Sequence, residues 1–249
     1  MNRSFQDDGY YLARSVIHPV TVQAWADLYR SLADENRVPE YNPVAINQPQ
    51  LQPLLSIIAR NFDLLDVVQE IWGPNIALYN QRFVVKDKHS RGPVMWHQDT
   101  PYHIGFMNKC SAFVALSESS QRNGGLQLMR GTHKYGYLGD AGEINTDCKP
   151  DGCWISEHEM KPGDVLFMHS ACWHCSPPHM DGPDRILADI IYQPADDPSG
   201  KELLRGEWKT HDRISEEMRE KLFVRSRSMR LKELQTKLDE YERTDAASN

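Results

Sequence analysis

Short segments rich in β-branched and aromatic residues follow one another from residue 76 to residue 198, and they constrain the fold more than any other feature. They are IALYNQRFVVK, VMWHQD, SAFVALSES, GLQLMRG, GDVLFMHSACWHCS and RILADIIYQP. Runs of this composition, bounded by polar turn residues, are typical of strands. Many short strands predict a sandwich or barrel rather than alternating strands and helices. We therefore expect a mainly β core over residues 76–198.

The parts of the chain on either side of this core have helical patterns. Residues 1–75 are predicted to be mostly helical, with Thr21 as the N-cap of a first helix that carries Val22 and Trp25 on one face. Residues 210–245 again place apolar side chains at helical spacing. This pattern favours a helix packed on the domain, and a homodimer contact is the alternative to a monomer. A chain of 249 residues can form one large β domain with such additions, so we expect a single domain over residues 1–249.

Composition excludes several classes of protein. The net charge of −7 argues against a nucleic-acid partner, which would require a basic face. No apolar run approaches the ~20 residues that cross a bilayer, and the N-terminal residues lack the apolar centre of a signal peptide. We therefore expect a cytoplasmic protein without a membrane partner.

The cysteines leave a minor alternative open. Their odd number, five, favours free thiols over a disulfide framework. Cys172 and Cys175 nevertheless form a C-x-x-C pair. Together with Cys148 and Cys153 they could hold zinc, although the spacing of a zinc ribbon is missing.

The sequence WHQD contains a candidate pair of metal ligands. Side chains at positions i and i+2 of a strand point to the same face, so His97 and Asp99 converge while Gln98 points away. A third ligand from a distant histidine would complete two histidines and one carboxylate, a set that suits non-haem Fe(II). The candidates for that ligand are His133, His158, His169, His174 and His179.

His174 lies in a segment that also predicts an anion site. If the strands before and after the PPHMDGPD loop form a hairpin, Ser176 lies roughly opposite Arg185. A hydroxyl beside the two-pronged guanidinium would form a clamp for a carboxylate.

In order and spacing, five pieces of the chain resemble the phytanoyl-CoA dioxygenase family from about residue 5 to about residue 195. The pieces are FQDDGYY, WHQD, NGGLQLMRGTHKYG, GDVLFMHSACWHCS and Arg185. The resemblance implies a double-stranded β-helix (jelly-roll, cupin-like) that binds Fe(II) and 2-oxoglutarate. It further implies that the iron ligands are His97, Asp99 and His174, and that Arg185 and Ser176 hold the distal carboxylate of 2-oxoglutarate.

The resemblance also implies further site residues and an activity. Phe113 and Asn80, or its neighbour Gln81, are expected near the cosubstrate, while Tyr102 and His103 are expected to line the substrate pocket. The implied enzyme consumes O2 and 2-oxoglutarate, with ascorbate as an in-vitro stimulant, and oxidises a C–H bond of a small-molecule metabolite.

Two features of the chain bear on the reaction. Related halogenases carry a small residue at the position of Asp99, so the intact carboxylate predicts oxygenation rather than chlorination. The competing interpretation is a cupin-like isomerase or metal-binding protein that does not use 2-oxoglutarate. Such a protein has no reason to keep Ser176 and Arg185 at the clamp spacing.

Overall fold

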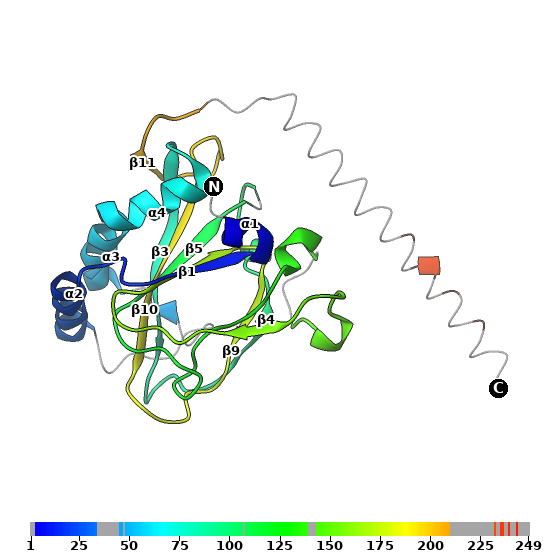
Figure 1. The fold of residues 1–249 in the computed structure, drawn as a ribbon, viewed down its shortest axis with the longest axis horizontal. Helices are drawn as coiled ribbons and strands as arrows, with labels where there is room; N and C mark the ends of the chain where they lie inside the picture. Colours follow the sequence, from blue (N-terminus) through cyan, green and yellow to red (C-terminus); the bar gives the residue numbers. More distant parts are fainter. Residues whose placement is uncertain are drawn as a thin grey trace. The chain divides into compact units, whose positions relative to one another are not determined.

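The computed structural model describes residues 3–33, 45–46, 48–106, 108–138 and 143–209, together with residues 232, 235–236, 239 and 243 (Figure 1). The chain divides into one compact unit over Met1–Lys209 and a second over Thr210–Asn249. The helices predicted for residues 210–245 and their dimer contact lie almost wholly outside the described residues. The single-domain organisation therefore stays a prediction.

Two antiparallel sheets form the core of the first unit. The large sheet has seven strands, with β1, β8, β5, β10, β3 and β11 side by side in that order and β2 paired to β3. The small sheet has four strands in the order β4, β9, β6 and β7. The strands are β1 (Tyr10–Ala13), β2 (Ala45–Ile46), β3 (Ile76–Lys86), β4 (Val94–His97), β5 (Cys110–Ala115), β6 (Gln127–Met129), β7 (Ile155–Glu157), β8 (Val165–His169), β9 (Trp173–Ser176), β10 (Arg185–Pro194) and β11 (Glu202–Arg205). The predicted mainly β core of antiparallel strands is confirmed.

Helices cover one face of the large sheet (Figure 1). They are α1 (Arg3–Asp8), α2 (Pro19–Leu32), α3 (Gln52–Ala59) and α4 (Phe62–Trp72), and short 3₁₀ turns span Pro49–Leu51, Thr100–Tyr102, Thr132–Tyr135 and Thr146–Cys148. Asn61 caps α4 by accepting a hydrogen bond from the amide of Leu64 at 3.0 Å. Gly73 ends that helix with a φ of 85°, a conformation that glycine adopts at little cost.

The N-terminal part differs from its prediction in two respects. The cap of α2 is His18 rather than Thr21, because Pro19 fits the first helical position and the His18 ring accepts a hydrogen bond from the amide of Val20. Residues Tyr10–Ala13 form β1, an edge strand of the large sheet that pairs with β8. A strand of four residues offers too little periodicity to be recognised among helices.

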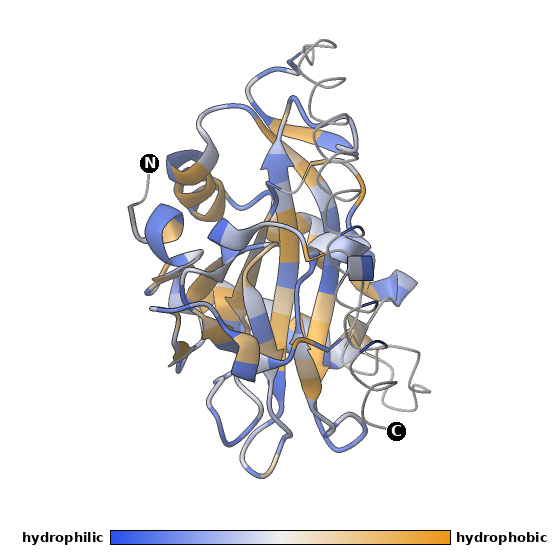
Figure 2. Ribbon diagram, turned by 90° about the vertical axis from the view of Figure 1, so that its right-hand side faces the viewer, coloured by the Kyte–Doolittle hydropathy of each residue, from blue (hydrophilic) through white to orange (hydrophobic). Residues whose placement is uncertain are grey.

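The strands of the large sheet separate two apolar layers. On β3, Phe83 packs against Tyr29 of α2, and Gln81 donates to Gln52 and Ser56 of α3. The opposite face of the same strand carries Val84, which belongs to a second cluster between the two sheets. Figure 2 shows the resulting short bands of hydrophobic and hydrophilic residues along the long strands. The functional pocket lies on this second face.

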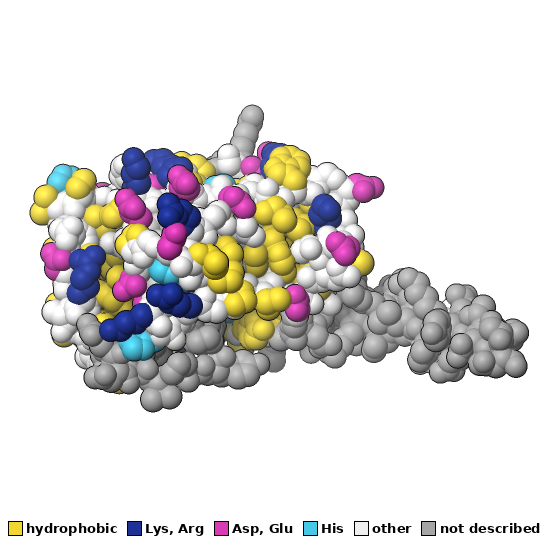
Figure 3. All heavy atoms as spheres, turned by 90° about the horizontal axis from the view of Figure 1, so that it is seen from below, with side chains coloured by type: hydrophobic (Ala, Val, Ile, Leu, Met, Phe, Trp, Pro, Cys, Tyr) yellow, Lys and Arg dark blue, Asp and Glu magenta, His cyan; other side chains and the backbone are white. Residues whose placement is uncertain are grey.

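The surface carries charges of both signs. On the face seen in Figure 3, Lys and Arg side chains are interspersed with Asp and Glu rather than gathered in a patch of one sign. Among the described residues, no helix has the length and apolar character of a membrane span.

Candidate metal centre

His97, Asp99 and His174 come together between the sheets and offer three ligand atoms within 4.8 Å of one another. His97 ends β4 and pairs with His174 of β9 across the small sheet. Asp99 Oδ1 lies 3.6 Å from His97 Nε2 and 3.8 Å from His174 Nε2. His97 and Asp99 thus converge as predicted, with His174 as the third member, but not on one strand face, because β4 ends at His97 and Asp99 has a φ of −78° and a ψ of −24°. We call these three residues the metal triad.

Backbone carbonyls fix the tautomer of both imidazoles. The Nδ1 atom of His97 lies 2.7 Å from the carbonyl oxygen of Met95, and Nδ1 of His174 lies 3.0 Å from that of Cys172. A carbonyl can only accept, so Nδ1 carries the proton and donates it. Each Nε2 then presents a lone pair to the centre, which is the arrangement that metal-binding histidines adopt.

The buried carboxylate of Asp99 completes the donor set. Burial opposes its ionisation, but the imidazoles of His174 and His97 and the charge of Arg82 outweigh burial and hold the pKa of Asp99 well below its usual range. Burial, reinforced by His97, lowers the pKa of His174 to about 4, so this ligand is neutral at pH 7. Asp99 Oδ2 is buried without a hydrogen-bond partner among the described residues. An anionic oxygen without a partner beside two imidazole nitrogens fits a divalent metal such as Fe(II).

Gln98, which follows the end of β4, points away from the centre. Its amide nitrogen donates to the carbonyls of Gly136 and Ala171 at 2.8 Å each, and its oxygen accepts from the amide of Leu138 at 3.1 Å. This residue therefore fixes the backbone between the two ligands.

Arg185 and Ser176 form the second part of the site. The Arg185 side chain is fully buried, and its Nη1 donates to Ser176 Oγ at 2.9 Å and to the carbonyl of Gly124. Its Nε and Nη2 are buried without partners among the described residues, and burial lowers the pKa of Arg185 to about 9. A guanidinium with two unused donors is a prepared site for a carboxylate.

The contact between Arg185 and Ser176 arises differently from the predicted hairpin. Ser176 belongs to β9 of the small sheet, whereas Arg185 begins β10 of the large sheet opposite Lys86 of β3. The loop between them crosses from one sheet to the other. The two side chains meet across the gap between sheets, so the predicted contact is present although its predicted origin is wrong.

A pocket with about 430 Å³ of empty space, part of it open to solvent, joins the metal triad to Arg185. Its lining comes from both sheets and consists of Arg82, Val84, Val94, His97, Asp99, Phe113, Leu126, His174, Cys175, Ser176 and Arg185.

The sequence predictions for this lining are met in part. Phe113 lines the pocket, whereas Asn80, Tyr102 and His103 are not among its lining residues. Gln81, the alternative to Asn80, faces α3. Arg82 was missed, although it lies two residues after Asn80 and hence on the same face of the strand.

Ser170 binds both ends of the segment that runs from Asp99 to Lys109. The carbonyl of Ser170 accepts from the amides of Asp99 and Thr100 at 3.0 and 3.1 Å, and its own amide donates to the carbonyl of Lys109 at 3.0 Å. The segment that contains Tyr102 and His103 is therefore a closed loop that starts at a metal-site residue.

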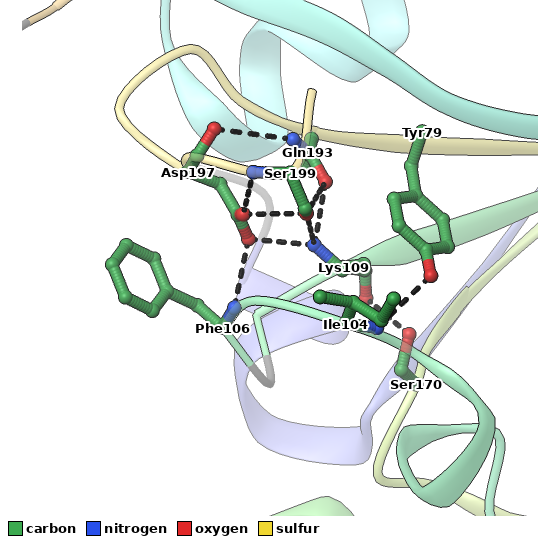
Figure 4. Close-up of polar contacts among 8 residues, drawn as sticks. All are labelled: Tyr79, Ile104, Phe106, Lys109, Ser170, Gln193, Asp197 and Ser199. Atoms are coloured by element: carbon green, nitrogen blue, oxygen red, sulfur yellow. Dashed lines mark hydrogen bonds and ion pairs between the residues drawn. The ribbon is translucent and has the colours of Figure 1, made fainter. Parts of the chain in front are cut away.

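A buried polar network holds the far side of this loop (Figure 4). The ammonium of Lys109, with no exposed side-chain surface, donates to Asp197 Oδ2 at 2.6 Å, to Gln193 Oε1 at 2.5 Å and to Ser199 Oγ at 3.0 Å. Asp197 Oδ2 also accepts from the amide of Phe106 at 2.9 Å. All three protons of this ammonium have acceptors, so the network is saturated.

The other histidines and the cysteines lie outside the metal triad. His133 makes the expected structural contact, with Nε2 3.0 Å from the carbonyl of Gln6, and His169 packs beside it. His179 lies near the carbonyl of Pro183 instead. The cysteines are free thiols, and within the described part of the chain only the metal triad brings metal-ligating groups together. A thiolate zinc site therefore finds no support there.

Comparison with known proteins agrees with this geometry. The profile of the phytanoyl-CoA dioxygenase (PhyH) family matches residues 5–186, which include the metal triad, Ser176 and Arg185. The chain therefore belongs to the phytanoyl-CoA dioxygenase family.

Individual relatives are more distant. An ectoine dioxygenase from Streptomyces anulatus is 25% identical over 161 residues, which cover 58% of this chain and 54% of that protein. The alignment thus spans only about half of the relative's length. The epimerase SnoN, solved with Fe3+, alpha ketoglutarate and nogalamycin RO, has a TM-score of 0.68 at 18% identity over 84% of this chain and 90% of its own. The apo form of EctD from S. alaskensis has a TM-score of 0.64 at 21% identity over 80% of this chain and 79% of its own. These solved structures show that the fold is shared.

Proposed function

We propose that this chain is an Fe(II)- and 2-oxoglutarate-dependent dioxygenase that hydroxylates or otherwise oxidises an unactivated C–H bond of a small-molecule metabolite, with release of succinate and CO2. The observation that carries the proposal is the pair of unused Arg185 donors in the same pocket as the metal triad. A dicarboxylate that chelates the metal at one end needs such a cation at the other. The competing isomerase or binding protein has no ligand that would occupy this guanidinium.

In this proposal the chain's residues bind the metal, orient 2-oxoglutarate and exclude water. His97, Asp99 and His174 hold the iron, which supplies the oxidising chemistry when O2 and 2-oxoglutarate are present. Asp99 occupies the third ligand position, so oxygenation rather than halogenation follows. Arg185 and Ser176 orient the distal carboxylate of 2-oxoglutarate.

The apolar walls of the pocket protect the reacting groups. Val84, Val94, Phe113 and Leu126 line it opposite the polar ligands. Such walls lower the local dielectric and keep water from the reaction. We place Tyr102 and His103 at the substrate side of the loop that Ser170 closes.

The substrate class is inferred from the site and from structural neighbours. SnoN was solved with nogalamycin RO, and another neighbour, HygX from Streptomyces hygroscopicus, was solved with hygromycin B and 2-oxoglutarate. We infer that this chain acts in the cytoplasm on a natural-product or other biosynthetic intermediate, as a monomer or as a homodimer through its C-terminal helix.

The test is succinate release by purified protein supplied with Fe(II), ascorbate and 2-oxoglutarate, with and without a metabolite library. His174→Ala should abolish both succinate release and stoichiometric iron binding. The matched control is His89→Ala, because His89 is an exposed histidine outside the pocket. Normal turnover in the His174 variant, or stoichiometric zinc on thiolates in protein purified without oxygen, would overturn the proposal.

A further inference from the structure

We propose that Lys109 is a positioning residue for the metal ligand Asp99. The buried ammonium of Lys109 fixes the place of its own backbone carbonyl, and this carbonyl holds Asp99 through Ser170. The inference rests on the proposed function, since it takes the metal triad to bind a divalent metal. It adds a residue that acts on the metal site from outside the pocket lining.

Asp99 is the one member of the metal triad that no strand holds. His97 ends β4 and pairs with His174 of β9, and a backbone carbonyl lies within hydrogen-bond distance of the Nδ1 atom of each imidazole. Asp99 lies beyond the end of β4, with a φ of −78° and a ψ of −24°. The pairing of β4 with β9 therefore does not set the direction of this carboxylate, and other contacts must do so.

Ser170 supplies such a contact. Its carbonyl accepts from the amide of Asp99 at 3.0 Å. Its own amide and hydroxyl both donate to the carbonyl of Lys109, at 3.0 and 3.2 Å. The ladder of β5 and β8 ends at the pair of Cys110 and His169, so Ser170 and Lys109 lie one position beyond it. The place of Asp99 thus depends on two residues just past the end of a ladder, where local opening costs least.

The network around the Lys109 ammonium opposes this opening (Figure 4). The ammonium has no exposed surface and donates to three acceptors at once, which belong to Gln193, Asp197 and Ser199. It also lies 4.5 Å from the centroid of the Tyr79 ring. An ammonium that meets three buried acceptors has one arrangement available, so the backbone of Lys109 is held as well.

Stability alone does not explain a buried ion pair at this position. Such a pair contributes little stability over apolar residues of similar size, because both charges lose their hydration. It can instead impose one geometry, since its charges and hydrogen bonds are all satisfied in a single arrangement. Only two hydrogen bonds, both made by Ser170, separate the Lys109 carbonyl from the Asp99 amide. The geometry of the network is therefore transmitted to a metal ligand.

The test separates positioning from stability with two variants of Lys109. Lys109→Met leaves the Asp197 carboxylate buried without its cation, so this variant should unfold at a lower urea concentration than wild type. The double variant Lys109→Met/Asp197→Asn removes the unpaired charge and should recover much of that stability. It does not restore the ammonium or its three hydrogen bonds. Stability should thus return in the double variant, whereas the positioning of Asp99 should stay lost in both.

Binding of Co(II) to the metal-free proteins, followed by visible absorption under argon, reports the ligand arrangement without turnover. We expect both variants to bind Co(II) about 10-fold more weakly than wild type, the lower end of the effect of lost contacts behind metal ligands. Their Co(II) spectra should also differ from that of wild type, because the carboxylate is no longer held. The matched control is Leu54→Ala, which opens a cavity in the core beneath α3. It should lower stability and leave both the Co(II) affinity and the spectrum unchanged.

The outcomes distinguish the inference from the proposed function. Wild-type Co(II) affinity in the double variant would overturn the inference, and so would an equal loss of affinity in Leu54→Ala, because the loss would then follow stability alone. The proposed function stands in either case. If the wild type itself binds no Co(II), the proposed function fails and the inference fails with it.

Ser199→Ala serves as the test if neither Lys109 variant folds. This change removes one acceptor of the ammonium and keeps the ion pair with Asp197. Weaker Co(II) binding than wild type in this variant would support the inference, and wild-type binding would overturn it.

Discussion

Replacing Arg185 with methionine should separate ligand binding from folding. The guanidinium is fully buried, and two of its nitrogens have no partner among the described residues. We predict that Arg185→Met leaves the ligand-free protein as stable as wild type or more stable. The same change should abolish its stabilisation by 2-oxoglutarate.

The change in stability and the loss of 2-oxoglutarate affinity can both be estimated from the structure. Burial lowers the pKa of Arg185 from 12.5 to about 9, and at about 1.4 kcal/mol per pH unit this corresponds to about 5 kcal/mol of unfavourable burial. Removing this burial cost offsets the lost hydrogen bond between Arg185 and Ser176. The Ser176 hydroxyl still donates to the carbonyl of Gly124 at 2.7 Å. Apolar replacement of buried ionic groups is typically neutral or stabilising by about 1–4 kcal/mol. Loss of two charge-assisted bonds to the ligand, about 1.5–3 kcal/mol each, weakens 2-oxoglutarate binding by about 10²–10⁴-fold.

Urea unfolding at fixed metal concentration, with and without 2-oxoglutarate, measures both effects. Wild type should gain stability with ligand concentration according to its Kd, while the Arg185→Met curves should coincide. A ligand-free variant less stable than wild type by more than about 1 kcal/mol would refute the argument from unsatisfied burial. A variant still stabilised by 2-oxoglutarate to the wild-type extent would refute the assigned role.

Further predictions concern the metal, the loop network and acid stability. Alanine at any member of the metal triad should reduce bound iron, measured by elemental analysis of protein purified without oxygen, to a small fraction of stoichiometric. Lys109→Met should destabilise the fold by about 3–5 kcal/mol in urea unfolding, because Asp197 stays buried without its cation, whereas Arg122→Met, which breaks an exposed pair, should leave the midpoint almost unchanged. Burial and the nearby His133 lower the pKa of His169 to about 4, so the unfolded chain, with a histidine pKa of about 6.5, binds more protons. This contribution to stability, at most about 3 kcal/mol for the 2.5-unit difference, is complete above about pH 6.5 and is lost as the pH falls towards 4. Unfolding midpoints between pH 7 and 4.5 should therefore depend less on pH in His169→Gln than in wild type.

The sequence predicts features that depend on local periodicity. His97 and Asp99 were expected to share a face because strand side chains alternate. The two side chains do converge and Gln98 points away, but β4 ends at His97 and Asp99 has helical backbone angles, so alternation is not the cause. His174 was one of five candidate histidines until the family pattern singled it out. The choice depends on a pairing between strands almost eighty residues apart, and no local pattern encodes such a pairing.

Features that depend on how the sheets face each other were not predictable in the same way. The contact of Ser176 with Arg185 was expected from a hairpin, yet it joins two different sheets. Arg82 was overlooked because a charged residue in a strand has an ordinary explanation at the surface. Its importance becomes visible only when Asp189 of β10 is placed behind it.

Three buried or half-buried cations of this chain differ in how many of their hydrogen-bond donors have acceptors, and this difference distinguishes structural from functional groups. Lys109 has acceptors for all three of its protons, so the network leaves it nothing to bind and its role is to hold the loop that starts at Asp99. Arg185 is equally buried but uses only Nη1, and its cost of burial is recovered when a ligand accepts from the remaining donors. Arg82 lies between these cases, since its Nε donates to Asp189 and its side chain is about 30% exposed and lines the pocket. Because unsatisfied donors are costly only until a ligand arrives, their number in a pocket indicates how many anionic groups the site is built to accept. In the proposed function, the free donors of Arg185 bind one carboxylate of 2-oxoglutarate.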